Sequence, residues 1–349
     1  MNQKTGVLLV NLGTPDAPTK TAVWRYLRQF LLDGRVIDIP WLGRNLLVRG
    51  IILPFRTGNS TKLYQQLWTP DGSPLKLYGE RLAAGVQRQL GDDFAVELAM
   101  RYQNPSIESA IERLMAKQVQ EILVFPLFPQ YASATTGSVH EEVMRVLSKK
   151  QTIPGLRFVN SYHNHEAMID IFADNAKQFG WENYDHVLFS FHGLPQRQLR
   201  KADAEQGRGH CLASPDCCQT LCAKNQFCYS AQCHATTAAL VKRMGLGKGQ
   251  YTTCFQSRLG KDPWVMPYTS EVIEERQKHG DKKLLVLCPA FVSDCLETTI
   301  EISVEYREEF LKKGGERLDL VPSLNDNPRW VEAVAHLIQK ESSAWQRHS

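Results

Sequence analysis

The sequence is organised around the stretch His186-Val187-Leu188-Phe189-Ser190-Phe191-His192-Gly193-Leu194-Pro195. Its apolar run has the length and content of a buried strand, and Gly193 and Pro195 end that strand in a turn. His192 therefore falls at the carboxyl end of a strand, where open α/β sheets bind ligands. Its imidazole can coordinate a metal or move a proton near neutral pH. A histidine that only satisfies a strand end, without chemistry, explains the same position.

The same alternation of strand and helix runs through the rest of the chain. Strands are predicted at 6–13, 96–102, 121–128, 156–162, 186–191, 251–256, 283–288 and 318–321. Helical patterns separate most of them, which favours an α/β fold of two doubly wound, Rossmann-like parallel sheets. Right-handed crossovers put the loops after the strands at one edge of each sheet, and we expect these edges to face a common cleft.

The segment 149–155 is predicted to link two domains. We expect an N-terminal α/β domain over 1–152 and a C-terminal α/β domain over 153–327, which carries a cysteine-rich insert at 205–230. A last helix is predicted within 328–349, and its packing against the first domain is left open.

Composition excludes several classes of protein. The 349 residues are 43% hydrophobic and 22% charged with a net charge of +4, which is ordinary for a globular protein. The small charge and the lack of a long basic run argue against binding to nucleic acid through phosphates. We find no signal peptide and no apolar run of about 18 residues, so we expect a cytoplasmic protein without a membrane-spanning helix.

One segment, residues 30–55, is unusually apolar and has arginines interspersed in it. This mixture suits a peripheral contact with a membrane surface or the apolar lip of a pocket. A plain core-facing helix and loop explains it equally well. Three arginines in or near the segment, Arg28, Arg44 and Arg49, are candidates for binding carboxylate groups of a ligand.

A second informative stretch runs from Pro289 to Glu305. It leaves a buried strand and enters a helix near Asp294, so the helix begins at the ligand edge of the sheet. Glu297, Glu301 and Glu305 are spaced four residues apart and share one helical face. Such a row of carboxylates can attract a divalent cation or carry protons away, although a solvated acidic face has the same pattern. Together with His192, it suggests a site that binds a cation and accepts protons.

At this point the sequence resembles the ferrochelatases. His192 lies in a stretch similar to their histidine motif, and Ser293-Asp294-Cys295-Leu296-Glu297-Thr298 resembles their acidic-helix motif. Further similar stretches follow in the expected order: Val10–Pro15, Gly72–Leu75, Arg101-Tyr102, Phe128–Tyr131, Thr135–Ser138, Phe255–Arg258 and Pro263-Trp264.

The resemblance implies a lyase that inserts Fe(II) into protoporphyrin IX to form protohaem, the last step of haem synthesis. His192 and Glu297 would be catalytic and would bind the metal, with Glu301 and Glu305 continuing the acidic path. Porphyrin-contacting residues carried over by motif are Leu12, Arg101, Tyr102, Tyr131 and Tyr162. Some family members have a histidine where this chain has Cys295, so that histidine's role is not carried over.

The insert holds five of the nine cysteines. Four thiolates can hold a [2Fe–2S] cluster, and some ferrochelatases carry such a cluster. We predict Cys211, Cys218, Cys222 and Cys228 as its ligands, with Cys217 as a substitute for Cys218. A zinc site is the main alternative. The other four cysteines, Cys233, Cys254, Cys288 and Cys295, are predicted to be buried as small hydrophobic residues.

Other functions fit parts of the pattern. A chelatase acting on another metal or tetrapyrrole, such as coproporphyrin III or a sirohydrochlorin, would have the same fold. A non-catalytic haem or porphyrin carrier would keep the cleft without insertion chemistry. A periplasmic-type binding protein also has two α/β domains. It would need an export signal, which we do not find, and it would have no use for the row of carboxylates.

Overall fold

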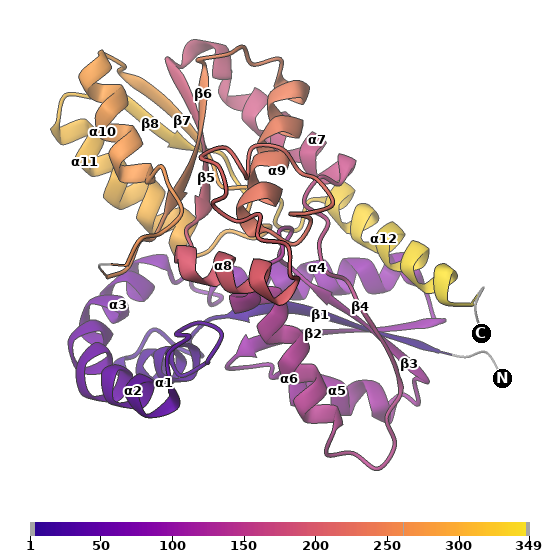
Figure 1. Ribbon diagram of the computed structural model, residues 1–349. Helices are drawn as coiled ribbons and strands as arrows, with labels where there is room; N and C mark the ends of the chain where they lie inside the picture. The colour runs from indigo at the N-terminus through magenta and orange to yellow at the C-terminus, as the bar shows by residue number, and fades with distance from the viewer. Residues whose placement is uncertain (1–3, 261, 347–349) are drawn as a thin grey trace. The chain divides into compact units, whose positions relative to one another are not determined.

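The computed structural model describes residues 4–260 and 262–346, which form two compact units (Figure 1). Unit 1 takes in the described residues of Met1–Phe128, Ser133–Asn160 and Asn325–Ser349, and unit 2 consists of Pro129–Ala132 and Ser161–Leu324. Within these residues each unit has a four-stranded parallel sheet, in the order β2-β1-β3-β4 in unit 1 and β6-β5-β7-β8 in unit 2. The predicted fold of two doubly wound parallel sheets is confirmed.

Unit 1 contains strands β1 (Thr5–Gly13), β2 (Phe94–Tyr102), β3 (Glu121–Pro126) and β4 (Gly155–Phe158). Its α-helices are α1 (Lys20–Leu31), α2 (Trp41–Leu46), α3 (Leu53–Leu67), α4 (Pro74–Leu90), α5 (Ile107–Ala116), α6 (Ser138–Leu147) and α12 (Pro328–Gln346). Two π-helical segments, η1 (Leu47–Ile52) and η2 (Ser133–Gly137), run directly into α3 and α6.

Unit 2 contains strands β5 (His186–His192), β6 (Tyr251–Gln256), β7 (Lys283–Leu287) and β8 (Arg317–Leu320). Its helices are α7 (Glu166–Phe179), the 3-10 turn η3 (Trp181–Asn183), α8 (Gln196–Glu205), α9 (Tyr229–Met244), α10 (Thr269–His279), the π-helix η4 (Leu296–Tyr306) and α11 (Arg307–Lys312).

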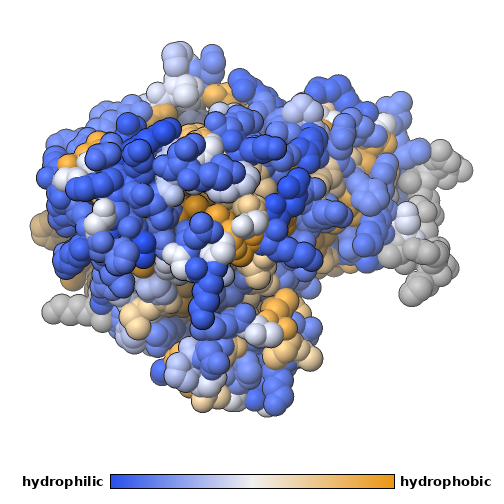
Figure 2. Space-filling view, turned by 90° about the horizontal axis from the view of Figure 1, so that it is seen from above, coloured by the Kyte–Doolittle hydropathy of each residue, from blue (hydrophilic) through white to orange (hydrophobic). Residues whose placement is uncertain are grey.

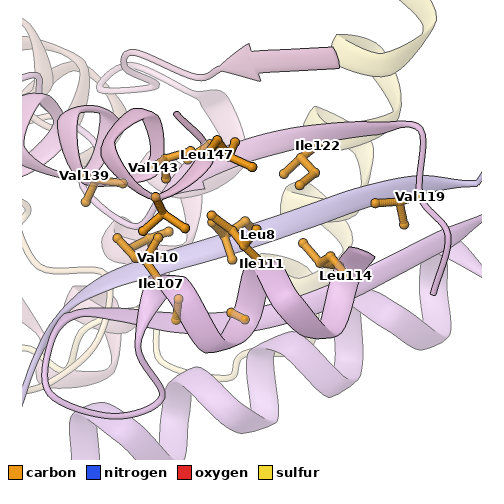
Figure 3. Packing of buried hydrophobic residues seen from close by; sticks show 14 of the residues in the cluster. Leu8, Val10, Ile107, Ile111, Leu114, Val119, Ile122, Val139, Val143 and Leu147 are labelled. Atoms are coloured by element: carbon orange, nitrogen blue, oxygen red, sulfur yellow. The ribbon is translucent and has the colours of Figure 1, made fainter. Parts of the chain in front are cut away.

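The core of unit 1 explains the apolar run of its first strand. Leu8 and Val10 point to the same face of the sheet, where they pack with residues of α5 and α6 (Figure 3). On the other face, Gly79 of α4 lies so close to Leu98 that an added Cβ would be 3.1 Å from that side chain. Because helices cover both faces, all four residues from Val7 to Val10 have no exposed surface.

The core of unit 2 follows the same rule. Leu188, Leu284, Val286 and Leu318 pack with α10, η4 and α11 on one face of the sheet. Cys254 and Cys288 belong to this cluster, and Cys233 and Cys295 are buried as well. The prediction that these four cysteines are buried is therefore confirmed.

The chain leaves unit 1 later than we predicted. The strand expected to open the second domain is β4, and it pairs with β3 in the sheet of unit 1, with Glu121 opposite Gly155. Residues 149–155 therefore connect α6 to β4 instead of linking domains. The last helix, α12, packs against α4 of unit 1. Residues 347–349 of the predicted helical segment lie outside the described residues.

One glycine of unit 1 tests the packing of the sheet directly. Gly13 ends β1 with φ +119°, and an added Cβ would lie 2.0 Å from the carbonyl oxygen of Tyr102. We expect Gly13→Ala to lower the free energy of unfolding by at least about 2 kcal/mol, since both the backbone conformation and the contact are lost. Urea unfolding measures the change.

The matched control is Gly58→Ala, in α3, where no atom lies within 4 Å of an added Cβ. Alanine favours a helix, so this variant should be unchanged or more stable by up to about 1 kcal/mol. Equal effects at the two positions would show that the close approach of β1 to Tyr102 does not matter for stability.

Candidate active site

The strand order of unit 2 brings His192 beside the loop that leads to the acidic helix. β5 lies between β6 and β7, so the connections from β5 and β7 diverge at this point of the sheet, where open α/β folds bind ligands. His192 is the last residue of β5, and Phe189 is paired with Leu287, the last residue of β7. The ring of Phe291, in the loop after β7, has its centroid 6.5 Å from that of His192.

The imidazole of His192 is half-buried and held by its own turn. Its Nδ1 lies 2.7 Å from the carbonyl oxygen of Gly193, which can only accept, so in the neutral ring Nδ1 carries the proton and Nε2 has the free lone pair. An added Cβ at Gly193 would lie 2.9 Å from the Gln256 carbonyl oxygen and 3.1 Å from the Trp264 ring. Glycine is therefore needed after the histidine for the turn to pack this closely.

The acidic helix differs from the prediction in its geometry. We expected an α-helix, but Leu296–Tyr306 is a π-helix that becomes α-helical only at Arg307. It begins at a capping box: the Cys295 sulfur accepts from the Thr298 amide, and the Cys295 amide donates to Thr298 Oγ1 at 3.0 Å. Cys295 thus starts the helix that carries the glutamates.

Glu301 is the most heavily bonded carboxylate of this helix. It accepts from the amide and hydroxyl of Ser257 at 2.9 and 2.6 Å, from Gln256 Nε2 at 3.1 Å and from the Tyr306 hydroxyl at 3.0 Å. Gln256 is paired with His192 across β5 and β6, and it also donates to the Glu297 carbonyl oxygen at 2.8 Å. Gln256 therefore connects the histidine strand to the acidic helix.

Gln256, Ser257 and Tyr306 are not among the predicted site residues. The available signal was the position of Gln256 and Ser257 directly after a predicted strand. Tyr306 follows Glu301 by five residues, which is one turn of a π-helix but not of an α-helix.

The remaining predicted metal ligands lie along the same helix without forming a closed site. Glu297 is half-buried and Glu305 is exposed. Partial burial, and then the charge of Glu301, raise the pKa of Glu305. Among residues 4–260 and 262–346, no group of three or more His, Cys, Asp or Glu side chains is arranged as a metal site. The metal-binding role of these residues stays a prediction.

Two of the predicted porphyrin contacts, Tyr131 and Tyr162, belong to unit 2. Tyr131 is half-buried, its amide donates to Gln232 Oε1 at 2.7 Å, and its ring packs edge-on against Phe227 with centroids 5.6 Å apart. Tyr162 is buried, which raises the pKa of its hydroxyl, and its amide donates to the Pro129 carbonyl oxygen at 3.0 Å.

The other predicted contacts, Leu12, Arg101 and Tyr102, belong to unit 1. Leu12 is half-buried near the end of β1. Arg101 Nη2 forms a salt bridge to Asp33 at 2.7 Å, and the Tyr102 and Ser138 hydroxyls donate to the same carboxylate oxygen at 2.8 and 2.5 Å. Tyr102 has no exposed surface, so any effect that it has on a ligand is indirect.

The arginines near the apolar segment are in different environments. Arg44 Nη1 donates to the carbonyl oxygens of Ile37 and Ile39, and the Arg28 guanidinium lies 5.5 Å from the centre of the Trp24 ring. Arg49 is exposed. Their proposed pairing with ligand carboxylates is not tested by these contacts.

The cysteine-rich insert gathers thiols around one small cavity, which is open to solvent and has a free volume of about 20 Å³. Cys211, Cys217, Cys218 and Cys228 line it, with sulfur–sulfur distances of 3.5 Å from Cys217 to Cys218 and 3.8 Å from Cys218 to Cys228. Cys222, which we predicted as a ligand, is exposed and does not line the cavity. Burial raises the pKa of Cys211 to about 11, whereas a hydrogen bond from Cys218 lowers that of Cys228.

The model of the ferrochelatase family matches residues 4–342 of the chain. A ferrochelatase of Coxiella burnetii (strain Dugway 5J108-111) is 45% identical over 339 residues, covering 97% of this chain and 94% of the relative. The chain belongs to the ferrochelatase family. A ferrochelatase of Legionella pneumophila (strain Lens) is 42% identical over 338 residues, 97% of this chain and 99% of the relative.

This membership confirms the predicted enzyme class, a lyase that inserts a metal into a tetrapyrrole, and the predicted reaction, insertion of ferrous iron into a porphyrin in haem synthesis. Ferrous iron and a porphyrin are its substrates. Two structures of SirB, one from Bacillus subtilis with Fe3+ and one from B. subtilis subspecies spizizenii with cobalt, share the fold. The first has a TM-score of 0.55 at 13% identity, and the match covers 99% of this chain and 98% of that chain. The second has a TM-score of 0.56 at 11% identity, and the match covers 98% of this chain and 96% of that chain.

The raised pKa of Glu305 gives a prediction for stability against pH. A carboxyl whose pKa is higher in the folded state destabilises the fold once it ionises, so this cost grows as pH rises above the ordinary value of 4.5. We expect Glu305→Gln to raise the free energy of unfolding at pH 7 by a few tenths of a kcal/mol, because the exposed side chain is well solvated. At pH 4 the gain should vanish. Urea unfolding at both pH values measures it.

Glu308→Gln is the control, since Glu308 pairs with Lys312 at 3.4 Å. It should give no gain at pH 7. A gain from Glu305→Gln that is larger at pH 4 than at pH 7 would contradict the assigned sign.

Proposed function

We propose that this ferrochelatase acts on protoporphyrin IX and that His192 and Glu297 carry the chemistry. The observation that supports this most is the hydrogen bond from His192 Nδ1 to the Gly193 carbonyl oxygen, because it leaves the Nε2 lone pair free at the ligand edge of the sheet. Leu12, Arg101, Tyr102, Tyr131 and Tyr162 remain proposed contacts or supports of the porphyrin.

Insertion of iron must remove two N–H protons from the macrocycle, and a base with a pKa near neutral pH does this best. His192 Nε2 accepts these protons one at a time, each passing on to the carboxylates of η4 before the next is taken, or it holds the incoming metal. Glu297, Glu301 and Glu305 then form a path for cations and protons along η4. Binding energy from contacts around the ring supplies the distortion that exposes the pyrrole nitrogens.

The central prediction is that His192→Ala lowers the rate of iron insertion at least about 100-fold, since general acid–base catalysis contributes this much or more. An anaerobic assay with Fe(II) and protoporphyrin IX measures haem formation. The control is His336→Ala, an exposed histidine of α12 in unit 1, which should keep the parent rate.

Other results would change the proposal. Full activity in His192→Ala would remove the histidine from the mechanism. Faster insertion into coproporphyrin III than into protoporphyrin IX would reassign the substrate. Tight porphyrin binding without insertion into any ring would make the protein a carrier.

We propose further that the thiol-lined cavity of the insert holds a [2Fe–2S] cluster. What supports this is the grouping of thiols: the Cys218 sulfur lies 3.5 Å from that of Cys217 and 3.8 Å from that of Cys228, and Cys211 lines the same cavity. These distances and the exposure of Cys222 favour Cys217 as the fourth ligand. The cluster would supply a redox-active cross-link within the loop.

The cluster proposal predicts a coloured protein containing iron and acid-labile sulfide. Cys217→Ser should lose the visible absorption bands, and Cys222→Ser should keep them. The reverse pattern would restore Cys222 as the ligand. A colourless protein with stoichiometric zinc would replace the cluster with the zinc alternative.

A third proposal is that the enzyme is cytoplasmic and touches a membrane surface through α2, η1 and the start of α3. Trp41, Leu42, Leu46, Ile51 and Phe55 in this segment are 56 to 79% exposed. Arg49 and Arg56 lie exposed among them. Figure 2 shows a different view, from above, in which the visible face is mostly hydrophilic with small hydrophobic patches. Apolar side chains with nearby arginines suit the interface of an anionic bilayer. No helix of the described residues is long and apolar enough to span a membrane.

The membrane proposal predicts co-sedimentation with anionic phospholipid vesicles. The double substitution Trp41→Ser and Phe55→Ser should weaken binding at least about tenfold, because two large apolar side chains no longer enter the interface. The control substitutes Met144 and Ile153, which are 50% and 56% exposed elsewhere in unit 1, by serine. Equal loss in both double variants would show that the segment has no special part in binding.

A further inference from the structure

A single hydroxyl group ties the catalytic strand to helix α9. Tyr229, the first residue of α9, donates from its hydroxyl to the carbonyl oxygen of His192 at 2.8 Å. Tyr229 is 8% exposed, so water has little access to this bond. Because His192 is the last residue of β5, this bond holds the main chain where it leaves the sheet.

The residue before Tyr229 is one of the cavity cysteines. Cys228 is the N-cap of α9: its carbonyl oxygen accepts from the Gln232 amide at 3.0 Å, and its sulfur lies 3.8 Å from that of Cys218. Figure 1 shows the loop after α8 leading into the start of α9. A change in the thiol-lined cavity therefore acts on the residue next to Tyr229.

The same helical turn also holds the loop of Tyr131. Gln232 is 1% exposed, accepts from the Tyr131 amide at 2.7 Å and donates to the Gln226 carbonyl oxygen at 2.6 Å. Phe227 of the insert packs against the Tyr131 ring. One turn thus contacts the cysteine loop, the histidine and a proposed porphyrin contact, all within unit 2.

We propose that Tyr229 is a positioning residue for His192 and that the first turn of α9 couples the state of the cysteine cavity to the rate of metal insertion. This rests on the proposed role of His192. The Tyr229 hydroxyl fixes the end of β5, and with it the orientation of the imidazole. Loss of the contact between Cys218 and Cys228 shifts the start of α9 and releases that hold.

The first experiment compares Tyr229→Phe with Tyr184→Phe. Both variants lose one tyrosine hydroxyl bond in unit 2, since Tyr184 donates to Asp319 at 2.5 Å. Tyr229→Phe should lower kcat for iron insertion about 3- to 10-fold, as expected for one hydrogen bond, with an unchanged KM for porphyrin. Tyr184→Phe should keep both constants. Equal kinetics in the two variants would overturn the positioning role.

A second readout does not depend on activity. In protein free of porphyrin and iron, 15N resonances of the His192 ring report which nitrogen is protonated. At a pH where the ring is neutral, the parent and Tyr184→Phe should show the Nδ1–H tautomer alone, and Tyr229→Phe should show a second tautomer. A single unchanged population in Tyr229→Phe contradicts the proposal, even if the parent enzyme inserts no iron. Absence of insertion in the parent defeats the proposed function instead.

Coupling to the cavity is tested by a double-mutant cycle with Cys228→Ser and Tyr229→Phe. Cys228→Ser should lower kcat at least about 3-fold alone, but less than about 2-fold in the Tyr229→Phe background, because both changes act through one bond. Losses that multiply would overturn the coupling. If Cys228→Ser unfolds the protein, Cys218→Ser takes its place in the cycle, since it removes the sulfur contact without changing the helix cap.

Discussion

The parallel pairing of β5 with β6 on one side and β7 on the other is the constraint on which the candidate site depends. A parallel sheet brings the carboxyl ends of its strands to one edge, so the three loops that follow these strands meet there. They carry His192, Ser257 and the segment leading to Glu297. None of these groups needs a long-range contact of its own to be brought close to the others.

The acidic helix raises a separate physical problem, because carboxylates one turn apart repel each other. In the structure, hydrogen-bond donors from neighbouring residues stabilise the middle carboxylate. Glu301 accepts hydrogen bonds from Ser257, Gln256 and Tyr306, while Glu305 is left exposed, where water screens its charge. The middle carboxylate of the row is thus fixed, and the last one remains solvated.

Much of this arrangement could be predicted because it depends on local patterns. The apolar run before His192, the buried cysteines of the sheet and the spacing of the glutamates are all short-range signals. The π-helix could not be predicted, since the four-residue spacing of the glutamates fits an α-helix equally well. Tyr306, which donates to Glu301, follows it by five residues, a spacing that does not place two residues on one face of an α-helix. The short β4 could be predicted as a strand, but its four half-buried residues do not indicate which of the two sheets it joins. The exposure of Cys222 depends on how the insert folds, about which the spacing of its cysteines says nothing.

Asp33 illustrates a different consequence of burial. One carboxylate oxygen receives Arg101, Tyr102 and Ser138, while the other accepts from the Arg35 amide at 2.7 Å. These groups come from the end of β2, the start of α6 and the loop after α1. The Asp33 side chain is only 6% exposed and binds all of these groups at once. Without it, the guanidinium of Arg101 would be buried without a partner, which is costly. The three segments are therefore joined through one carboxylate, and a displacement of any one of them breaks a hydrogen bond to Asp33.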